Sequence, residues 1–449
     1  MTSDRQLHLL VFGHVPGSLA GAWRIPGVEN DRASLLRRLV QTAQVAERGL
    51  LDGIFYADAL NYGPEATWPH KQPDDFEPIT TAAYLAATTE RLGLVVTGSS
   101  QFQPPYTIAR QLLSLDTLSG GRAGWNLVTS FAEAAAANFG DRGVVPHDER
   151  YRQAEEVLEI VQKLWDSLES DAVVGDRDRG IYTDVSKLHR TDHRTESFQV
   201  RGPLGAHRSP QGQPVIFQAG ASTAGTAFAA RHADAIFTGH PLLAQSQAFY
   251  ERIRSEARAA GRSTLPIVTP GLSFVVGSSD EEAARFEETV RESFIPEYQA
   301  GWLQEVDIDV TGLPLDGPVP LDRFAAASEK HHTALAGYKT LATEGNPSLR
   351  EFLYRTISAF GLRVVGSPER IADEIQFRYE NGAADGFILQ PPVVPDQLEL
   401  FVEHVVPLLQ QRGLFRREYA GTTLRDHLGL TPPANRHTAA RAHTLTAAR

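Results

Sequence analysis

The chain contains no cysteine, and its one methionine is Met1. The lack of thiolates excludes disulfides, thiolate-bound zinc, iron–sulfur clusters and a cysteine nucleophile. The chain also has no apolar run that approaches the roughly 20 residues of a membrane-spanning helix. Its first residues lack the basic and long apolar regions of a secretory signal. We therefore expect a cytoplasmic protein without a membrane segment.

An excess of positive charge is missing too. The 43 Lys and Arg residues face 55 Asp and Glu residues, which gives a formal net charge of -12. A nucleic-acid surface needs clustered Lys and Arg to replace counterions, so we expect a small-molecule ligand and no nucleic acid. With 42% apolar residues, the 449-residue chain can bury a large core, as one barrel with insertions or as several smaller domains.

Short apolar runs alternate along the chain with longer segments of helical period. This alternation predicts parallel strands joined by crossover helices. The runs cover residues 7–13, 53–58, 92–97, 123–129, 215–219, 235–238, 267–276 and 386–390. Eight such strands predict an α/β fold of the (β/α)8 TIM-barrel class.

Two stretches exceed what a barrel needs, at about 170–213 and 278–366, the longer one between the seventh and eighth strands. Insertions of this length commonly build the mouth of a site or a lid. Ser367, Pro368 and Glu369 after the second stretch form a helix-start signal. We expect one barrel domain over residues 1–430 and a tail over 431–449 that is loose or packs on a neighbour.

Polar residues finish or follow most of the predicted strands. In TIM barrels the chemistry lies at these carboxyl ends. A lone Asp after a strand is commonly only a helix cap, but polar residues at six strand ends together indicate a site. The candidates are His14, Asp58, Thr97, Asn126, Ser222 and His240.

The segment 218–225 runs from a strand into a helix through small residues. Such a turn lets backbone N–H groups approach an anion at the helix N-terminus, so a phosphate would fit there. It departs from both the dinucleotide fingerprint and the nucleophile elbow. An alternative remains that Ser222 is a simple N-cap on a tightly packed helix.

His147 and Tyr151 stand four residues apart at the predicted start of a helix, where they can face the same side and grip one ligand. Alternatively, Tyr151 packs on the barrel and His147 is solvated. His189 and His193 have the same spacing, but no carboxylate helix motif accompanies them. We expect those two histidines to lie on the surface and the protein to bind no metal.

Aromatic residues concentrate near the first three strand ends. Most belong to the core, but one or two at the mouth would give a flat ligand an apolar face. Phe12 and Trp23 are the candidates for substrate contact.

The stretch from Leu115 to Ser130, LDTLSGGRAGWNLVTS, resembles the bacterial luciferase-like monooxygenases of the nitrilotriacetate, dibenzothiophene sulfone and pristinamycin synthase type. The resemblance extends over nearly the whole chain and is weakest between about 300 and 360. The other matching stretches are 21–24, 76–78, 109–111, 147–151, 201–204, the Ser222 loop, 382–387, 412–416 and 424–429.

The resemblance implies that FMN lies across the barrel mouth. The flavin-contacting positions of such enzymes fall on Asp58 and Thr97 beside the ring system, on Tyr151 and Ser222 at the phosphate, and on His147. Asn126 is added to these cofactor-binding residues because of its place at the end of the fourth predicted strand.

The resemblance also implies a two-component system. A separate NAD(P)H:FMN reductase supplies FMNH2, which meets O2 and forms a peroxide at C4a or at N5 that inserts one oxygen atom into the substrate. The chain agrees in lacking a nicotinamide fingerprint. We expect a homodimer or homotetramer.

Because the cofactor carries the chemistry, the protein mainly has to orient it and exclude water. His14 and His240 are the candidates for hydrogen bonding to the peroxide or for acting as a general acid. The aromatic residues favour an aromatic or heterocyclic, sulfone-like substrate, since no convergent Arg and Lys residues for a polycarboxylate can be placed. Two alternatives stay open, a deazaflavin-dependent oxidoreductase on the same barrel and a flavin-binding protein without catalysis.

Overall fold

The structure is a computed structural model that describes residues 6–73, 75–130, 132–140, 143–220, 222–325, 332–357 and 361–439. The chain divides into two compact units. The first unit comprises Met1–Phe76 and Gln218–Glu418, and the second comprises Glu77–Phe217 and Tyr419–Arg449. None of the helices within the described ranges is long and apolar enough to cross a membrane.

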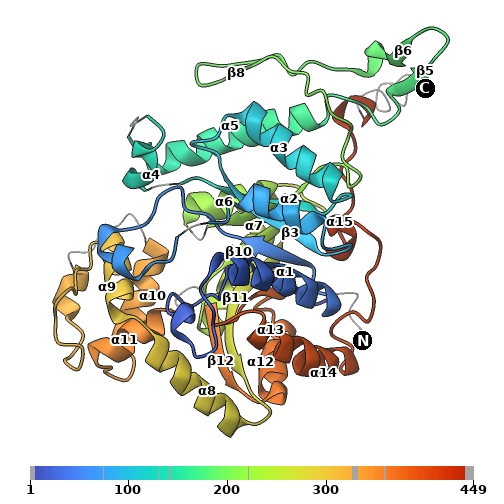
Figure 1. Ribbon diagram of the computed structural model, residues 1–449. Helices are drawn as coiled ribbons and strands as arrows, with labels where there is room; N and C mark the ends of the chain where they lie inside the picture. The colour runs from blue at the N-terminus through green and yellow to red at the C-terminus, as the bar shows by residue number, and fades with distance from the viewer. Residues whose placement is uncertain are drawn as a thin grey trace. The chain divides into compact units, whose positions relative to one another are not determined.

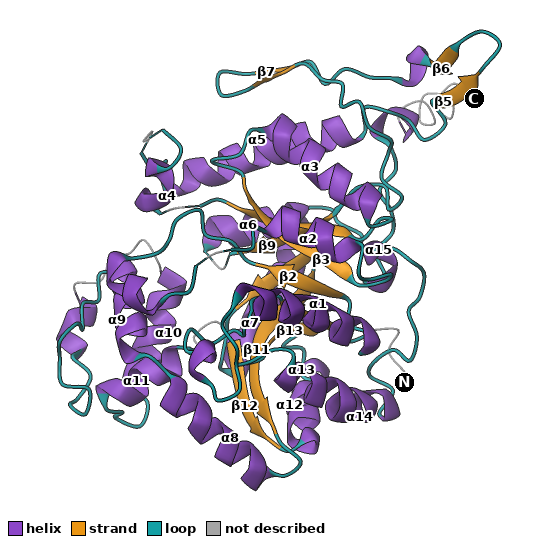
Figure 2. Cartoon of the chain, in the orientation of Figure 1, coloured by secondary structure: helices purple, strands orange, loops and turns teal. Residues whose placement is uncertain are grey.

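All eight predicted strands are present in one nine-stranded sheet (Figure 2). They are β1 (His8–Phe12), β2 (Gly53–Tyr56), β3 (Gly93–Ser99), β4 (Ala123–Val128), β9 (Val215–Ala219), β10 (Ala235–Thr238), β11 (Ile267–Val276) and β13 (Gly386–Gln390). The order is β10-β9-β4-β3-β2-β1-β13-β11-β12, and β10 also pairs with β11, which closes a parallel barrel. The predicted fold class is confirmed.

The first unit contains the helices that follow most of these strands. Its helices are η1 (Ala22–Arg24), α1 (Arg32–Arg48), η2 (Glu65–His70), α6 (Thr223–His232), α7 (Leu243–Ala259), α12 (Pro368–Glu380), α13 (Asp396–Leu400), the π-helical η7 (Phe401–Val405) and α14 (Val406–Gln411). The signal for the start of α12 is correct, because the Ser367 hydroxyl accepts a hydrogen bond from the N–H of Arg370.

A long segment of the first unit lies between β11 and β13 in the chain and forms its own apolar core. It holds α8 (Asp280–Ser293), α9 (Pro296–Leu303), η4 (Gln304–Val306), η5 (Leu321–Ala325), α10 (His332–Thr343), α11 (Leu349–Thr356) and β12 (Gly361–Gly366). In Figure 1, α9, α10 and α11 lie together in gold and orange. Leu303, Ile308, Leu349 and Phe352 are among the residues fully buried in this core.

The strand β12 was not predicted. β11 is ten residues long; its first four residues pair with β10, and the six from Gly271 to Val276 pair in parallel with β12. An uncovered edge of that length would present unpaired backbone groups, and β12 satisfies them.

The second unit contains β3, β4 and the helices that pack on them. Its remaining elements are α2 (Pro78–Ala86), α3 (Pro105–Leu118), α4 (Glu133–Ala137), α5 (His147–Trp165), β5 (Val173–Asp176), β6 (Ile181–Thr183), η3 (Val185–Lys187), β7 (His193–Arg194), β8 (Gln199–Val200) and α15 (Leu424–His427). The stretch from about 170 to 213 therefore forms two antiparallel hairpins, β5–β6 and β7–β8.

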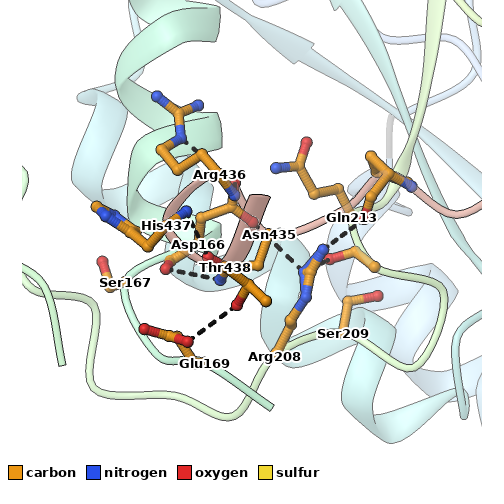
Figure 3. Close-up of polar contacts among 12 residues, drawn as sticks. Asp166, Ser167, Glu169, Arg208, Ser209, Gln213, Asn435, Arg436, His437 and Thr438 are labelled. Carbon is orange, nitrogen blue, oxygen red and sulfur yellow. Dashed lines mark hydrogen bonds and ion pairs between the residues drawn. The ribbon is translucent and has the colours of Figure 1, made fainter. Parts of the chain in front are cut away.

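The tail is not loose over residues 431–439. The buried Asn435 donates its side-chain N–H to the Asp166 carbonyl at 3.0 Å, and the backbone N–H of Arg436 donates to the Asp166 carboxylate at 3.3 Å (Figure 3). Arg208 donates to the Pro433 carbonyl at 2.5 Å. The sequence did not reveal this attachment, because the partners are far apart in the chain.

His189 and His193 are partly buried and paired with carboxylates, whereas the sequence analysis placed them on the surface. The Nε2 atom of His189 lies 2.7 Å from a carboxylate oxygen of Glu169, and its ring stacks on His437 at 3.7 Å between centroids. The His193 side chain is 8% exposed and lies 2.9 Å from the Glu156 carboxylate. Among the described residues no group of three or more potential ligands could hold a metal ion.

Candidate functional site

Three phenylalanines of the first unit form an aromatic layer. Phe12 at the end of β1 is in register with Phe55 of β2, and both rings contact Phe237 of β10. Because β10 adjoins neither β1 nor β2 in the sheet, the three rings can meet only across the barrel interior. Phe55 is buried, whereas Phe12 and Phe237 are partly exposed, so Phe12 belongs to the accessible part of the layer.

His14 lies next to this layer. Its exposed ring stacks on Phe12 at 5.6 Å between centroids. Gly13 between them has no room for a side chain, since a Cβ would lie 2.3 Å from the ring of the buried Tyr56. The two candidates Phe12 and His14 are therefore brought together, although their contacts with substrate stay predictions.

Several buried polar atoms of the first unit have no hydrogen-bond partner among the described residues. They are Oε1 of Gln218, Oγ1 of Thr238, Nε2 of His240 and Nε1 of Trp23. Such atoms cost free energy unless a ligand or water satisfies them. Gln218 and Thr238 lie at the ends of β9 and β10, and His240 follows β10 by two residues, which fits a ligand site. Gln218 and Thr238 belong to the polar strand ends of the sequence analysis but were not among its candidate site residues.

The surroundings of the His240 imidazole favour its neutral form. Burial lowers the pKa of His240, and the nearby Arg252 guanidinium lowers it further. The ring packs on Phe249 at 5.0 Å between centroids. A neutral ring can accept a proton, which a general acid or base requires.

Trp23 and Asp58 lie outside the strands. Trp23 is on the short η1 helix, partly buried, and its carbonyl accepts a hydrogen bond from Asn30 at 3.0 Å. Asp58 follows β2 by two residues and is exposed.

Ser222 is the N-cap of α6. Its hydroxyl accepts a hydrogen bond from the N–H of Gly225 at 3.1 Å, so the alternative that Ser222 caps the helix is correct. The neighbouring Ala221 lies outside the described residues. A role of Ser222 toward a phosphate stays a prediction.

In the second unit, Thr97 and Asn126 form a buried pair. They are directly opposite each other on β3 and β4, and the Asn126 amide donates to the Thr97 hydroxyl at 2.8 Å. The other end of that amide, Oδ1, is buried without a partner among the described residues. The hydrogen bond fixes the amide so that Oδ1 can accept from a ligand.

His147 and Tyr151 face the same side of α5, as predicted. Their rings meet at 5.2 Å between centroids. The His147 side chain is 42% exposed, and its Nδ1 lies 3.0 Å from the Asp148 carboxylate. Between them, the half-buried Arg150 has a pKa lowered by burial and a buried Nε without a partner among the described residues. Sequence reasoning missed Arg150, because an arginine in a first helical turn usually faces solvent.

The stretch from Leu115 to Ser130 supports the fold rather than a ligand at its most polar positions. Asp116 is buried and accepts hydrogen bonds from Gln211 at 2.7 Å and from the N–H of Ala123 at 3.1 Å. Burial raises the pKa of Asp116. Arg122 is likewise buried and donates to backbone carbonyls of its own unit.

A closed parallel (β/α)8 barrel with polar strand ends is the framework of many enzymes whose sites lie at that end. The pattern of the family described as luciferase-like monooxygenase matches residues 18–386, and the chain belongs to this family. The expected flavin-dependent monooxygenase is confirmed by this membership and by the relatives below.

N-acetyl-S-(2-succino)cysteine monooxygenase of Bacillus subtilis (strain 168) is 41% identical over 97% of this chain and 100% of its own length. Nitrilotriacetate monooxygenase component A of Aminobacter aminovorans is 40% identical over 97% of this chain and 99% of its own. The solved riboflavin lyase with modified FMN and riboflavin has a TM-score of 0.80 and 34% identity, covering 95% of this chain and 97% of that one.

Proposed function

We propose that this chain is the oxygenase component of a two-component system that uses FMNH2 and O2 to insert one oxygen atom into a small organic substrate. Family membership supports the reaction class. The relative named component A supports a separate partner, for which we propose an NAD(P)H:FMN reductase. The FMN in the riboflavin lyase structure supports the cofactor.

The observation that carries the cofactor proposal is the buried Oδ1 of Asn126 beside Thr97. An isoalloxazine ring offers N–H donors that such a fixed acceptor can satisfy. We assign Asn126, Thr97 and Asp58 to the ring system. His147, Tyr151 and Ser222 complete the set, the last two for the phosphate, to which hydroxyl groups donate.

Reduced FMN would supply the activation of O2. The protein's own residues orient the cofactor, exclude water and hold protons. His240, whose pKa is lowered by burial, can take up a proton at Nε2. His14 on Phe12 can hold a second proton at the exposed side of the aromatic layer.

The aromatic layer also bears on the substrate. Phe12, Phe55 and Phe237 present an apolar floor inside the barrel, and Trp23 adds an indole N–H without a partner among the described residues. We assign Phe12 and Trp23 to an aromatic or heterocyclic substrate body, because flat rings pack well on such a floor.

The outer face of the second unit supports a homo-oligomer. A groove on α2 and α3 is bordered by Tyr106 and Leu118, of which Leu118 is 66% exposed. Exposed apolar side chains clustered in this way are typical of protein contacts. We propose that the chain forms a homodimer or homotetramer.

The test replaces Ser222 by Ala and Tyr151 by Phe and measures FMNH2 binding. Each change removes a hydrogen bond to a charged phosphate, worth about 1.5 to 3 kcal/mol. Ser367→Ala is the matched control, since it removes an N-cap of the same unit without touching the proposed site. Parent-like FMNH2 affinity in the double variant would refute the assignment.

Oxygen uptake with a generic FMN reductase and a mixed substrate panel tests the reaction. We expect oxygen consumption and products heavier by one oxygen atom. Turnover under strict anaerobiosis would favour the deazaflavin-type reductase. Tight FMN binding without any oxygenated product would favour a flavin-binding protein.

A further inference from the structure

Three polar residues form a row across β13, β11 and the unpredicted strand β12. Ser273 of β11 is in register with Gln390 of β13 on one side and with Arg363 of β12 on the other. The Ser273 hydroxyl donates to Gln390 Oε1 at 3.1 Å. Gln390 is the last residue of β13, so the row lies at the carboxyl end, where barrel enzymes place their chemistry.

The row shares its face with the aromatic layer. Phe237 of that layer is in register with Thr269, and Ser273 is four residues further along β11, on the same face because strand side chains alternate. On the other side, Val11 is in register with Leu389, so Phe12 and Gln390 are the next residues along the two strands. The row therefore adjoins the accessible edge of the aromatic layer.

A small cavity opens at this row. It is shallow and open to solvent, with room for little more than one water-sized group, and its lining includes the polar Ser18, Ser273, Arg363 and Gln390 and the apolar Leu19. A cavity this small admits a single polar group, such as one oxygen of a carboxylate, while the rest of a ligand would lie outside it.

Arg363 is only partly satisfied by the protein. Its Nη2 donates to Glu287 at 2.5 Å and to the Tyr354 hydroxyl at 2.8 Å. Its Nε is buried and has no partner among the described residues. The side chain is 18% exposed. Arginine has donors in a planar fork that matches a carboxylate.

The charges around Arg363 leave an excess of positive charge. Glu287 also contacts Arg291 at 3.5 Å, and Glu351 pairs with both Arg291 at 2.8 Å and Arg355 at 3.0 Å. Three guanidinium groups thus share two carboxylates. An additional anion at the cavity would balance the cluster.

We propose that Arg363, with Ser273 and Gln390, forms a substrate subsite for a carboxylate group. This inference deepens the proposed function and rests on it for the identity of the ligand as a substrate. The apolar body of the acid lies on the Phe12 side, and its carboxylate accepts from Arg363 and Gln390 Nε2. The preferred substrates are accordingly organic acids with an apolar body.

The test compares 3-phenylpropionate with 3-phenylpropanamide, which share a body and differ in charge. Binding of each to the full chain with oxidised FMN is measured by titration calorimetry. We expect the acid to bind at least about tenfold more tightly than the amide, the difference that one charge-assisted hydrogen bond supplies. Equal binding of the two probes, or no binding of the acid, would overturn the proposal.

Variants separate recognition from a structural ion pair. Arg363→Gln should abolish the preference for the acid, and Gln390→Glu should do so while leaving the Arg363–Glu287 pair intact. Glu287→Gln should keep or increase the preference, because Arg363 loses a competing carboxylate. Arg350→Gln is the control, since this exposed arginine of the same segment pairs with Asp316. A preference that persists in Arg363→Gln would refute the subsite.

Failure of the carboxylate subsite can be distinguished from failure of the proposed oxygenase function. FMN binding and oxygen uptake are measured on the same preparations. A parent protein that prefers the acid but consumes no oxygen would refute the oxygenase proposal alone. A parent that consumes oxygen but does not discriminate the probes would refute the subsite alone.

Discussion

Replacement of Arg122 should lower the free energy of unfolding more than replacement of an exposed residue. Its guanidinium is buried and makes five hydrogen bonds of 2.6 to 3.0 Å. The acceptors are the carbonyl oxygens of Ala86, Thr89, Leu92 and Ser119 and the hydroxyl of Thr89. The side chain thus joins the ends of α2 and α3 to the start of β3.

The size of the stability loss follows from the carbonyl and hydroxyl acceptors that would be left without a donor. Arg122→Met removes all five bonds and leaves buried carbonyls, each worth about 1 to 3 kcal/mol when unsatisfied. Removal of a buried charge offsets part of this loss, and the bonds are not additive. We expect a decrease of about 3 to 5 kcal/mol in the free energy of unfolding. Arg122→Lys should lose about half of that, since an ammonium reaches fewer acceptors.

Urea unfolding followed by circular dichroism measures the change. Arg110→Met is the control, because Arg110 is an exposed arginine on the neighbouring α3, and we expect a change within about 0.5 kcal/mol there. If Arg122→Met were no more destabilised than Arg110→Met, the hydrogen bonds of Arg122 would contribute nothing to stability, and the argument would be refuted.

Truncation after Leu430 should lower the free energy of unfolding by about 1 to 3 kcal/mol, because Asp166 and Glu169 lose buried and partly buried hydrogen bonds to the tail; an unchanged melting temperature would contradict this. The lowered pKa of His240 means that the folded state binds fewer protons than the unfolded state just below pH 6.5. Its contribution is therefore present above about pH 6.5 and lost on acidification. His240→Asn should weaken this acid-side loss in urea unfolding between pH 5 and 8; identical pH profiles would show that His240 does not titrate in this range.

The barrel could be predicted from the sequence because each of its strands is a short apolar run. β3 is buried along its whole length, so a continuous run marks it. β12 was not predicted because Arg363 interrupts its apolar run of residues and because it borders a segment with its own core. The local sequence pattern does not reveal β12, because its only partner among the described strands is the second part of β11, from Gly271 to Val276.

The strand-end rule selected Thr97, Asn126 and His240 as candidates, because residue position along a predicted strand is readable from sequence. It did not select Arg363, whose neighbours come from distant segments. Whether a buried polar atom has a partner depends on packing in three dimensions. That property distinguishes these residues from other polar ones.

The attachment of the tail to the end of α5 has a consequence for chimaeras between relatives. Asp166 lies just beyond α5, and its partners Asn435 and Arg436 lie near the end of the described chain. A crossover anywhere between these segments would join halves that come from different parents. Recombinants should therefore stay stable only when both segments are inherited together.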